Sequence, residues 1–489
     1  MKWLPASIRI WKQHWISSDH NPRKIDMKNI LLACLIICSA GTFAQSAAPT
    51  DLPPLAQDVR NETLRAWQSY EQYAWGHDAL KPLSKGYEDW YSEPLYISPI
   101  DAYSTLYMMG FTEETRRIEQ YVSDSLNFDK DIEAKVFEVN IRILGGLLSM
   151  YELSGNPKVL DKARDFGDRM LPAFSTPTSI PTYWVNLRTG ETSGNEVNVA
   201  EAATYTFEMG ILSYYTQDPK YYQAGKKATK AIFDRRSEIG LIGDVIDVQT
   251  GKWTSENSHI CAGVDSYYEY LYKSYLLFGD EELGTMWDAS IDAIQKYIAE
   301  EYDGKLWYGR VNMHTGVQTS TVITLYDAFF PATLALSGDM ERAVELQNSW
   351  HWLWAKYGLE PMAYDYKKDK VTYPVYDLNP EIMESACYLY HLTGDSTWLR
   401  MNEEFWNDIK THCGTDAAFT RVLDVTTMQQ GDYMATYFFA ETLKYLYLTF
   451  AGEQSGYTFF DYLYNTEAHP FLRSHFDHEK AGSYLGFSR

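Results

Sequence analysis

The sequence predicts an all-α fold, a closed (α/α)7 barrel of seven helical hairpins with short β-hairpins on one rim. A pattern recurs seven times: an aromatic or aliphatic helix end, a turn rich in Gly and Asp, and a new helix. After a first gap of about 45 residues, the repeats follow at about 56–62 residues, which is typical of a repeat architecture. Gly ends a helix at its left-handed C′ position, and Asp or Asn caps the next helix. The turns are Met109-Gly110-Phe111, Leu153-Ser154-Gly155-Asn156-Pro157, Tyr215-Thr216-Gln217-Asp218-Pro219, Phe278-Gly279-Asp280, Leu336-Ser337-Gly338-Asp339, Leu392-Thr393-Gly394-Asp395 and Phe450-Ala451-Gly452-Glu453.

The two ends of this array favour a closed ring over an open solenoid. A solenoid needs polar capping repeats at its ends, whereas both terminal hairpins here are as aromatic as the middle ones. Between the hairpins lie strand-like stretches such as residues 240–248, which end at Thr250-Gly251 and predict short β-hairpins over one rim. No change in composition follows residue 60, so residues 61–489 are predicted to form a single (α/α)7 domain.

The chain begins with a segment that is interpreted as an extension plus a secretory signal peptide, residues 1–44. After Met27, residues 30–40 are apolar, and small residues precede an expected cleavage after Ala44. We therefore expect a secreted or periplasmic protein of bacterial type. Either Met27 is the true start or the basic segment ahead of it is unusually long. A lipoprotein signal ending at Cys34 leaves too short an apolar run to be favoured. Residues 45–60, rich in Ala, Pro and Ser, are interpreted as a linker.

Composition narrows the class of partner. The chain has 489 residues, of which 45% are hydrophobic and 15% aromatic, with a formal net charge of −23. Such an anionic surface argues against nucleic acid and anionic lipid as partners. No later segment is apolar over a length that spans a membrane. We expect a monomer. Three cysteines remain after processing, Cys261, Cys387 and Cys413; they match no zinc pattern, allow at most one disulfide, and are interpreted as small buried hydrophobes.

Acidic residues recur at one phase of the repeat, just inside apolar helices. An acid among apolar neighbours is destabilising unless it is paired or functional. Any one of them fits a helix N-terminal acid favoured by the dipole, but six together indicate a shared cavity. Converging carboxylates with abundant aromatic residues suit glycoside hydrolysis, in which one carboxyl protonates the leaving oxygen and another activates water or attacks. The six are Glu138, Asp265, Glu381, Glu384, Glu441 and Glu467.

Further polar residues are candidates for the site. Arg142 lies one helical turn after Glu138 and shares its face. His77 and Asp78 follow Trp75-Gly76, and His77, like His469, is interpreted as either a substrate contact or a structural histidine. Near the C-terminus, residues 464–470 bring a hydroxyl, a carboxylate and an imidazole together, a set that suits a hard cation held through oxygen ligands. The alternative is a surface turn.

Several motifs together resemble one family. They are Ala74-Trp75-Gly76-His77-Asp78-Ala79-Leu80-Lys81-Pro82, Phe137-Glu138 with Ile141-Arg142-Ile143-Leu144-Gly145-Gly146, Asp265-Ser266-Tyr267-Tyr268-Glu269-Tyr270-Leu271, Pro380-Glu381 with Glu384-Ser385, Ala440-Glu441-Thr442-Leu443-Lys444-Tyr445-Leu446, and Asn465-Thr466-Glu467-Ala468-His469. In this order, over roughly residues 60–471, they resemble the class I α-1,2-mannosidases of glycoside hydrolase family 47. Residues 262–265 and 327–331 are similar to the branch of ER degradation-enhancing mannosidase-like proteins.

The resemblance implies an (α/α)7 barrel and an inverting hydrolase of α-1,2-linked mannose with one Ca²⁺ bound by the hydroxyl and carbonyl of Thr466. It implies Glu138 as general acid, Glu381 as general base and Asp265 as a third catalytic acid. The remaining site residues are implied to bind substrate or to order calcium waters. These are Arg142, Glu384, Tyr437, Glu441, Glu467, His77 and Asp78. The expected partner is an α-mannoside oligosaccharide, a glycoprotein N-glycan or mannan.

The sequence also departs from the family at specific positions. Trimming enzymes carry Arg where this chain has Gly263 and Asn379, and Phe where it has Tyr437. The family's disulfide does not map onto Cys261, Cys387 or Cys413. The missing arginines put branch preference in question and leave two alternatives open. One is a mannose-binding, lectin-like protein on the same scaffold with weak or no turnover. The other is an (α/α)-barrel hydrolase with a different linkage specificity.

Overall fold

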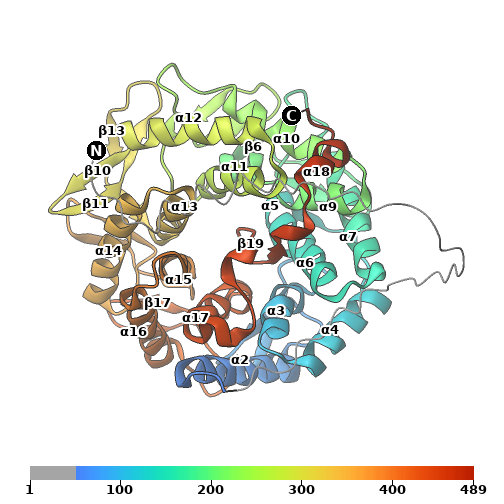
Figure 1. The fold of residues 1–489 in the computed structure, drawn as a ribbon, viewed down its shortest axis with the longest axis vertical. Coiled ribbons are helices and arrows are strands. Elements are labelled where there is room, and N and C mark those ends of the chain that lie inside the picture. Colours follow the sequence, from blue (N-terminus) through green and yellow to red (C-terminus); the bar gives the residue numbers. More distant parts are fainter. Residues whose placement is uncertain (1–50, 489) are drawn as a thin grey trace, which may run out of the picture. The chain divides into compact units, whose positions relative to one another are not determined.

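Helices alternate between an inner and an outer ring around a central axis (Figure 1). The computed structural model describes residues 51–488, and all structural statements concern these residues. The inner helices are α3 (Ile97–Met108), α6 (Gly145–Ser154), α9 (Glu208–Thr216), α11 (Asp265–Phe278), α13 (Phe330–Ser337), α15 (Glu381–Thr393) and α17 (Leu443–Ala451). The outer helices are α2 (Pro54–Tyr73), α4 (Thr112–Asp124), α7 (Pro157–Met170), α10 (Lys220–Phe233), α12 (Glu281–Tyr297), α14 (Met340–Tyr357) and α16 (Ser396–Cys413).

The ring closes where the first and the last of these helices meet. Six inner helices each pack against the outer helix that follows them, from α3 with α4 to α15 with α16. The seventh pair is not a hairpin, because α17 packs against α2 from the other end of the chain. The turn at residues 450–453 therefore leads into a strand pair, and the predicted seventh hairpin is replaced by this closing pair. The predicted (α/α)7 barrel is confirmed.

Hydrophobic patterning separates the two rings. The inner helix α13 buries every residue from Phe330 to Leu336, as expected of a helix that is surrounded by protein. The outer helix α7 buries only one stripe, Val159, Ala163, Phe166, Gly167 and Met170, and leaves its charged residues on the other face. The barrel interior is thus filled by inner-helix side chains, among which the few polar groups stand out.

Short strands and helical turns join the helices. The strands are β1 (Ala79–Lys81), β2 (Gly86–Glu88), β3 (Glu133–Lys135), β4 (Trp184–Asn186), β5 (Thr192–Ser193), β6 (Glu196–Asn198), β7 (Val245–Asp247), β8 (Trp253–Ser255), β9 (Asn257–Ser258), β10 (Ala299–Tyr302), β11 (Lys305–Tyr308), β12 (Arg310–Asn312), β13 (Gln318–Ser320), β14 (Val322–Thr324), β15 (Ala363–Asp365), β16 (Lys370–Tyr373), β17 (Val422–Asp424), β18 (Gln429–Gln430), β19 (Tyr462–Tyr464) and β20 (Pro470–Leu472). The short helices are α5 (Val136–Val139), α8 (Val199–Ala203), α18 (His478–Leu485), the π-helical turns η1 (Asn140–Leu144) and η4 (Phe438–Thr442), and the 3₁₀ turns η2 (Leu171–Phe174), η3 (Leu325–Phe329), η5 (Gly452–Ser455), η6 (Phe459–Asp461) and η7 (Arg473–His475).

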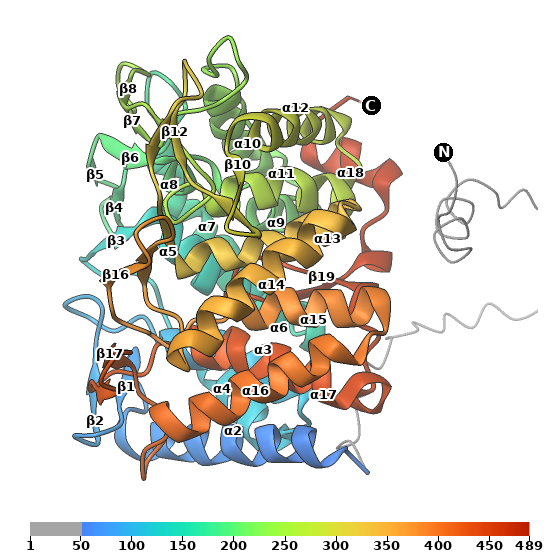
Figure 2. The same cartoon turned by 90° about the vertical axis from the view of Figure 1, so that its left-hand side faces the viewer.

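Most of the antiparallel strand pairs gather on one rim of the barrel (Figure 2). The region around residues 240–251 supplies β7 to a three-stranded sheet with β6 and β8, as the sequence predicts. Several of the segments that lead into inner helices begin directly after these strands: α5 follows β3 and leads through η1 into α6, and α8 follows β6 and precedes α9. The first residues of the inner helices therefore lie at the rim that carries the hairpins.

The C-terminal hairpin is the exception, because β19 lies in the middle of the ring (Figure 1). It follows α17 and is joined to β20 by the turn of residues 465–469. Glycine permits this close approach: a Cβ atom on Gly145 would lie 2.6 Å from Asn465 Nδ2, and one on Gly146 would lie 2.4 Å from Ile100 Cγ2. The pair of glycines at the start of α6 thus makes room for the turn.

The described residues also bear on the remaining predictions. Residues 54–60, interpreted from the sequence as linker, form the first turns of α2, which has Pro at its start where the missing N–H is not needed. Cys261, Cys387 and Cys413 are buried free thiols. In residues 51–488 no helix is long and apolar enough to cross a membrane. The signal-peptide interpretation, including cleavage after Ala44, concerns residues outside the described part.

Candidate active site

Three of the predicted acids begin inner segments on different sides of the barrel. Glu138 lies in α5, Asp265 is the first residue of α11, and Glu381 is the first residue of α15. All three are only partly buried, and the Glu138 side chain keeps 26% of its surface exposed. They therefore lie where the barrel interior opens toward the hairpin rim. Carboxyl groups on separate helices can reach a ligand from different directions.

Electrostatic coupling shows that these acids share one space. Burial raises the pKa of Asp265 to about 7, and the charges of Glu269 and Glu138 raise it too. Burial likewise raises the pKa of Glu381 to about 8, with contributions from Glu384 and Asp265. Each carboxylate thus makes its neighbours harder to ionise, which is the arrangement expected at a site built for proton transfer or for a cation.

Arg142 joins two parts of the cluster. It lies in the π-helical turn η1, and only 8% of it is exposed. Its Nε donates to Glu138 Oε2 at 3.0 Å, while its Nη1 donates to Glu467 and lies 3.6 Å from Asp101 Oδ2. The guanidinium also lies over the Tyr437 ring, 5.5 Å from its centroid. One arginine therefore orients the proposed acid and the C-terminal turn together.

Two further predicted acids are buried deeper in the barrel. Glu384 accepts a hydrogen bond from the Tyr445 hydroxyl at 3.1 Å and lies 3.9 Å from Lys273 Nζ. Glu441 lies in the second π-helical turn, η4, and burial together with the charge of Glu467 raises its pKa well above the ordinary value. These groups are unfavourable as isolated ions, so a nearby positive charge would stabilise them.

The turn between β19 and β20 is fixed by Asn465. Its Oδ1 accepts hydrogen bonds from the backbone N–H groups of Glu467 (3.0 Å) and His469 (2.8 Å). Its Nδ2 donates to Ile141 O (3.0 Å) and to Glu208 Oε1 (2.8 Å). The amide thus uses all of its groups within the protein, and the turn has little freedom.

Thr466 is the half-buried residue at the tip of this turn. Its backbone N–H donates to the Tyr270 hydroxyl at 3.2 Å, and within residues 51–488 its hydroxyl and carbonyl oxygens make no hydrogen bond. The described part of the chain holds no group of three or more His, Cys, Asp or Glu side chains placed to bind a metal. Two oxygens on one residue, next in the chain to the buried acid Glu467, nevertheless fit a hard cation that takes oxygen and water ligands.

His77 and Asp78 organise the loop before α3. The buried Asp78 carboxylate accepts hydrogen bonds from three backbone N–H groups, those of Trp90 (3.1 Å), Leu95 (2.8 Å) and Ile97 (3.2 Å). His77 Nδ1 lies 2.9 Å from Asp89 Oδ2. The structure thus gives Asp78 a role in shaping the loop, and a direct contact of either residue with substrate stays a prediction. His469 is fully buried, and its Nε2 lies 3.5 Å from Asp101 Oδ1.

Several buried polar residues of the site were not predicted. Glu208 accepts hydrogen bonds from Asn140, Tyr270 and Asn465, and burial raises its pKa to about 7. Lys444 is fully buried and donates to Ser104 Oγ at 2.9 Å and to the Ala468 carbonyl, and burial lowers its pKa to about 7. Both were detectable in principle, since each is a charged residue inside an apolar helix.

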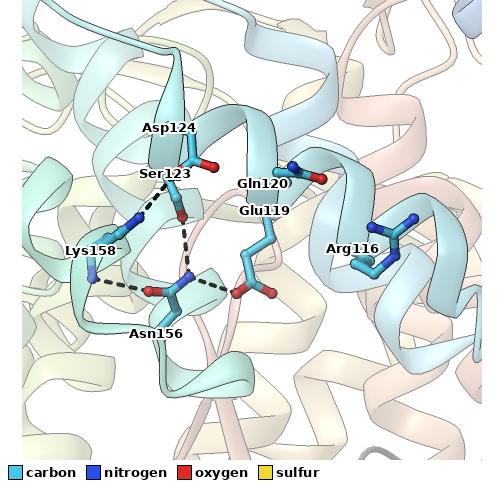
Figure 3. Close-up of a pocket in the computed structure, with 7 residues that line it drawn as sticks. All are labelled: Arg116, Glu119, Gln120, Ser123, Asp124, Asn156 and Lys158. Carbon is cyan, nitrogen blue, oxygen red and sulfur yellow. Dashed lines mark hydrogen bonds and ion pairs between the residues drawn. The ribbon is translucent and has the colours of Figure 1, made fainter.

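A separate hollow lies on the outside of the barrel (Figure 3). Its volume is about 450 Å³, and it is formed by α4 and the start of α7. Four of its polar side chains pair with one another: Asn156 Nδ2 donates to Glu119 Oε1 at 2.7 Å, and Lys158 Nζ donates to Asp124 Oδ1 at 2.9 Å. None of the converging acids lines it, so it is not the candidate site.

Comparisons with known proteins agree with this geometry. The sequence model of glycosyl hydrolase family 47 matches residues 62–473. The chain is 35% identical to the mouse ER degradation-enhancing alpha-mannosidase-like protein 2, over 90% of this chain and 81% of that protein. It is 33% identical to the human endoplasmic reticulum mannosyl-oligosaccharide 1,2-alpha-mannosidase, over 86% and 64%. The solved alpha-1,2-mannosidase from Trichoderma reesei superposes with a TM-score of 0.80 at 27% identity, covering 86% of this chain and 99% of that one. The chain therefore belongs to glycosyl hydrolase family 47.

Proposed function

We propose that this chain is a calcium-dependent, inverting exo-α-1,2-mannosidase that acts on the α-mannosides of glycans or mannan. Family membership and the names of its relatives support the reaction class. The observation that carries the proposal is the placement of Glu138, Asp265 and Glu381 near the starts of three inner segments. The negative charge of a neighbouring acid contributes to the raised pKa of both Asp265 and Glu381.

Glu138 is proposed to protonate the leaving glycosidic oxygen. Arg142 Nε holds its Oε2 atom, which leaves Oε1 for the substrate. Its partial exposure at the rim suits a group that must meet a bond between two sugars, one of which departs toward solvent. Asp265, whose Oδ1 accepts a hydrogen bond from Ser266 N at 2.7 Å, is proposed to position or relay the proton.

Glu381 is proposed to remove a proton from the attacking water. Its Oε1 atom lies 3.4 Å from Asn379 Nδ2, and its buried Oε2 atom has no hydrogen-bond partner in residues 51–488. An unpartnered acceptor of this kind is suited to hold a water molecule. Acid and base come from different helices and can therefore approach a bound sugar from different sides, and inversion requires room for a water molecule between base and sugar.

Thr466 is proposed to hold the calcium ion through its hydroxyl and carbonyl, with Glu384, Glu441 and Glu467 ordering waters around it. When bound, calcium supplies positive charge that favours the ionised forms of nearby carboxylates and the ordering of oxygen ligands. Arg142 supplies positive charge from the protein itself. We also propose that the protein is exported through the segment ending at Ala44.

The test is mannose release from α-1,2-mannobiose by the chain from Gln45 onward, with calcium or with a chelator. The Glu381→Gln variant is the matched control, and proton NMR identifies the first anomer released. The proposal expects β-mannose, and it expects release to require both calcium and Glu381. Calcium-dependent binding without release would favour the lectin-like alternative. Faster release from α-1,3- or α-1,6-mannobiose would assign a different linkage.

A further inference from the structure

We propose that Arg421 is a positioning residue for Glu381, acting through an ion pair with Asp377. Asp377 lies in a short segment, residues 376–380, that directly precedes Glu381. We term this segment the strap. It runs from the sheet-like contacts of Tyr376 to the first turn of α15. This proposal rests on the proposed role of Glu381 as the base. It adds Arg421, from a different part of the barrel, to the residues that position this base.

The ion pair has the geometry of a specific clamp. Arg421 Nε donates to Asp377 Oδ1 at 2.6 Å, and Nη2 donates to Asp377 Oδ2 at 2.8 Å. This two-point contact fixes direction as well as distance. The arginine is itself held in place, because its backbone N–H donates to Tyr433 O at 3.0 Å and its guanidinium lies over the Tyr433 ring, 4.9 Å from the centroid.

The strap is anchored on both of its sides. Tyr376 exchanges two backbone hydrogen bonds of 2.8 Å with Val422, the residue after Arg421. The Tyr437 hydroxyl donates to Asp377 O at 2.9 Å, and the Thr442 hydroxyl donates to the next carbonyl along the strap at 2.8 Å. Contacts from β17 and from the two ends of η4 therefore hold the strap directly before α15 begins.

The strap needs this hold because it contains a strained residue. Leu378 is fully buried and has a φ of 67°, in the left-handed region that non-glycine residues rarely adopt. Such a conformation persists only where the surroundings enforce it, and it is found preferentially at functional sites. Loss of the clamp on its neighbour Asp377 removes one of the contacts that hold Leu378 in this conformation.

Relaxation of the strap would move Glu381. The next residue, Asn379, donates from its side chain to Glu381 Oε1 at 3.4 Å, and the Tyr376 hydroxyl donates to Asn379 O at 3.1 Å. Pro380 is the N-cap of α15, and its carbonyl accepts a hydrogen bond from Glu384 N at 2.8 Å. A shift of about 1 Å at a catalytic group costs on the order of 100-fold in rate, so small strap movements have large effects.

The partial exposure of the Arg421–Asp377 ion pair helps to distinguish a positioning role from a purely stabilising one. The Arg421 side chain is 32% exposed and that of Asp377 is 17% exposed. A partly exposed ion pair contributes less to the free energy of unfolding than a fully buried one. The expected signature of a clamp is therefore a loss of turnover without a matching loss of thermal stability.

The experiment uses the calcium-loaded chain from Gln45 onward and compares Arg421→Ala, Arg421→Lys and Asp377→Asn with the wild type. We expect kcat on α-1,2-mannobiose to fall about 10- to 100-fold in Arg421→Ala, with little change in KM or melting temperature. Arg421→Lys should retain part of the activity, and sub-denaturing guanidinium should restore part of it to Arg421→Ala.

Arg188→Ala is the matched control. Arg188 also pairs with an aspartate on the hairpin rim, lying 3.4 Å from Asp129, but it is remote from the strap in the sequence and belongs to the connection between β4 and β5. It should leave kcat unchanged. Wild-type kcat in Arg421→Ala, or a loss that follows the melting temperature and is not rescued by guanidinium, would overturn the proposal.

Hydrogen–deuterium exchange keeps this inference separate from the proposed function. Peptides covering residues 376–384 should exchange faster in Arg421→Ala than in the wild type, whereas Arg188→Ala should leave them unchanged. If the wild type releases no mannose but strap exchange responds to Arg421→Ala, the proposed hydrolase is wrong and the clamp stands. Unchanged strap exchange would refute the clamp whatever the activity.

Discussion

Replacement of Arg142 by methionine should be among the most destabilising single changes in the barrel. Methionine fills much of the same space but leaves three carboxylates without their cation: Glu138, Glu467 and Asp101. Glu138 is partly hydrated, whereas Glu467 and Asp101 are buried and cannot be solvated in place. Removing one partner of a buried ion pair costs about 3–5 kcal/mol, and we expect a loss in this range for Arg142→Met.

The pH dependence of the loss follows from the remaining acids. Burial raises the pKa of Glu467, and Arg142 opposes that rise. In the methionine variant the acid therefore takes up a proton more readily in the folded state than in the unfolded chain. Stability from such a group is present at low pH and is lost as pH rises. The deficit of Arg142→Met should thus be smaller at about pH 5 than at about pH 8.

Urea unfolding followed by tryptophan fluorescence, in chelator, measures this deficit. Arg169→Met is the control, because Arg169 pairs with Asp165 at 3.0 Å on the surface of α7 and should cost less than about 1 kcal/mol. Adding Glu467→Gln to Arg142→Met should recover part of the loss. A deficit for Arg142→Met that equals the Arg169→Met value, at both pH values, would refute this reasoning.

Four further outcomes are expected. Glu381→Gln should lower mannose release by about 10²–10⁴-fold while calorimetric binding of mannobiose persists, and full activity would exclude it as the base. In chelator, thermal stability should fall between about pH 5 and pH 8, because burial raises the pKa of Asp265 to about 7 and of Glu381 to about 8; a flat profile would contradict this. Gly145→Ala should cost about 1–3 kcal/mol in urea unfolding, since its Cβ would meet Asn465 Nδ2 at 2.6 Å, and an unchanged midpoint would show that the turn can move. Thr466→Val should weaken calcium binding in calorimetry, and unaltered affinity would place the ion elsewhere.

The helical repeat and the closed ring could be predicted from the sequence because both depend on local signals. Each Gly/Asp turn marks a helix end, and the period of the turns then implies the barrel. The acids were also visible, since a carboxylate in an apolar helix is conspicuous. The pairing of α2 with α17 could not be predicted from the repeat, because a contact between the two ends of the chain produces no periodic pattern in the sequence.

The details of the site depend on geometry that residue types do not encode. Arg142 and Glu441 both lie in π-helical turns, where one extra residue rotates the side chains that follow. Asp78 resembles a binding residue in the sequence, but its carboxylate is occupied by backbone N–H groups of the loop. The strained φ of Leu378 is equally invisible, because leucine gives no hint of a left-handed backbone.

Closure of the barrel by its two terminal segments has a consequence for how the protein is made. Because α2 needs α17 as its partner, the earliest part of the barrel to leave the ribosome waits for nearly the last. Contacts of such large sequence separation slow folding. Asn465 and Thr466 come later still, so the turn that carries Glu467 reaches the other acids only when the ring is complete. Under the proposed export, a chain of this design is best kept unfolded until it has crossed the membrane, and its fold and its proposed catalytic centre then arise in the same final step.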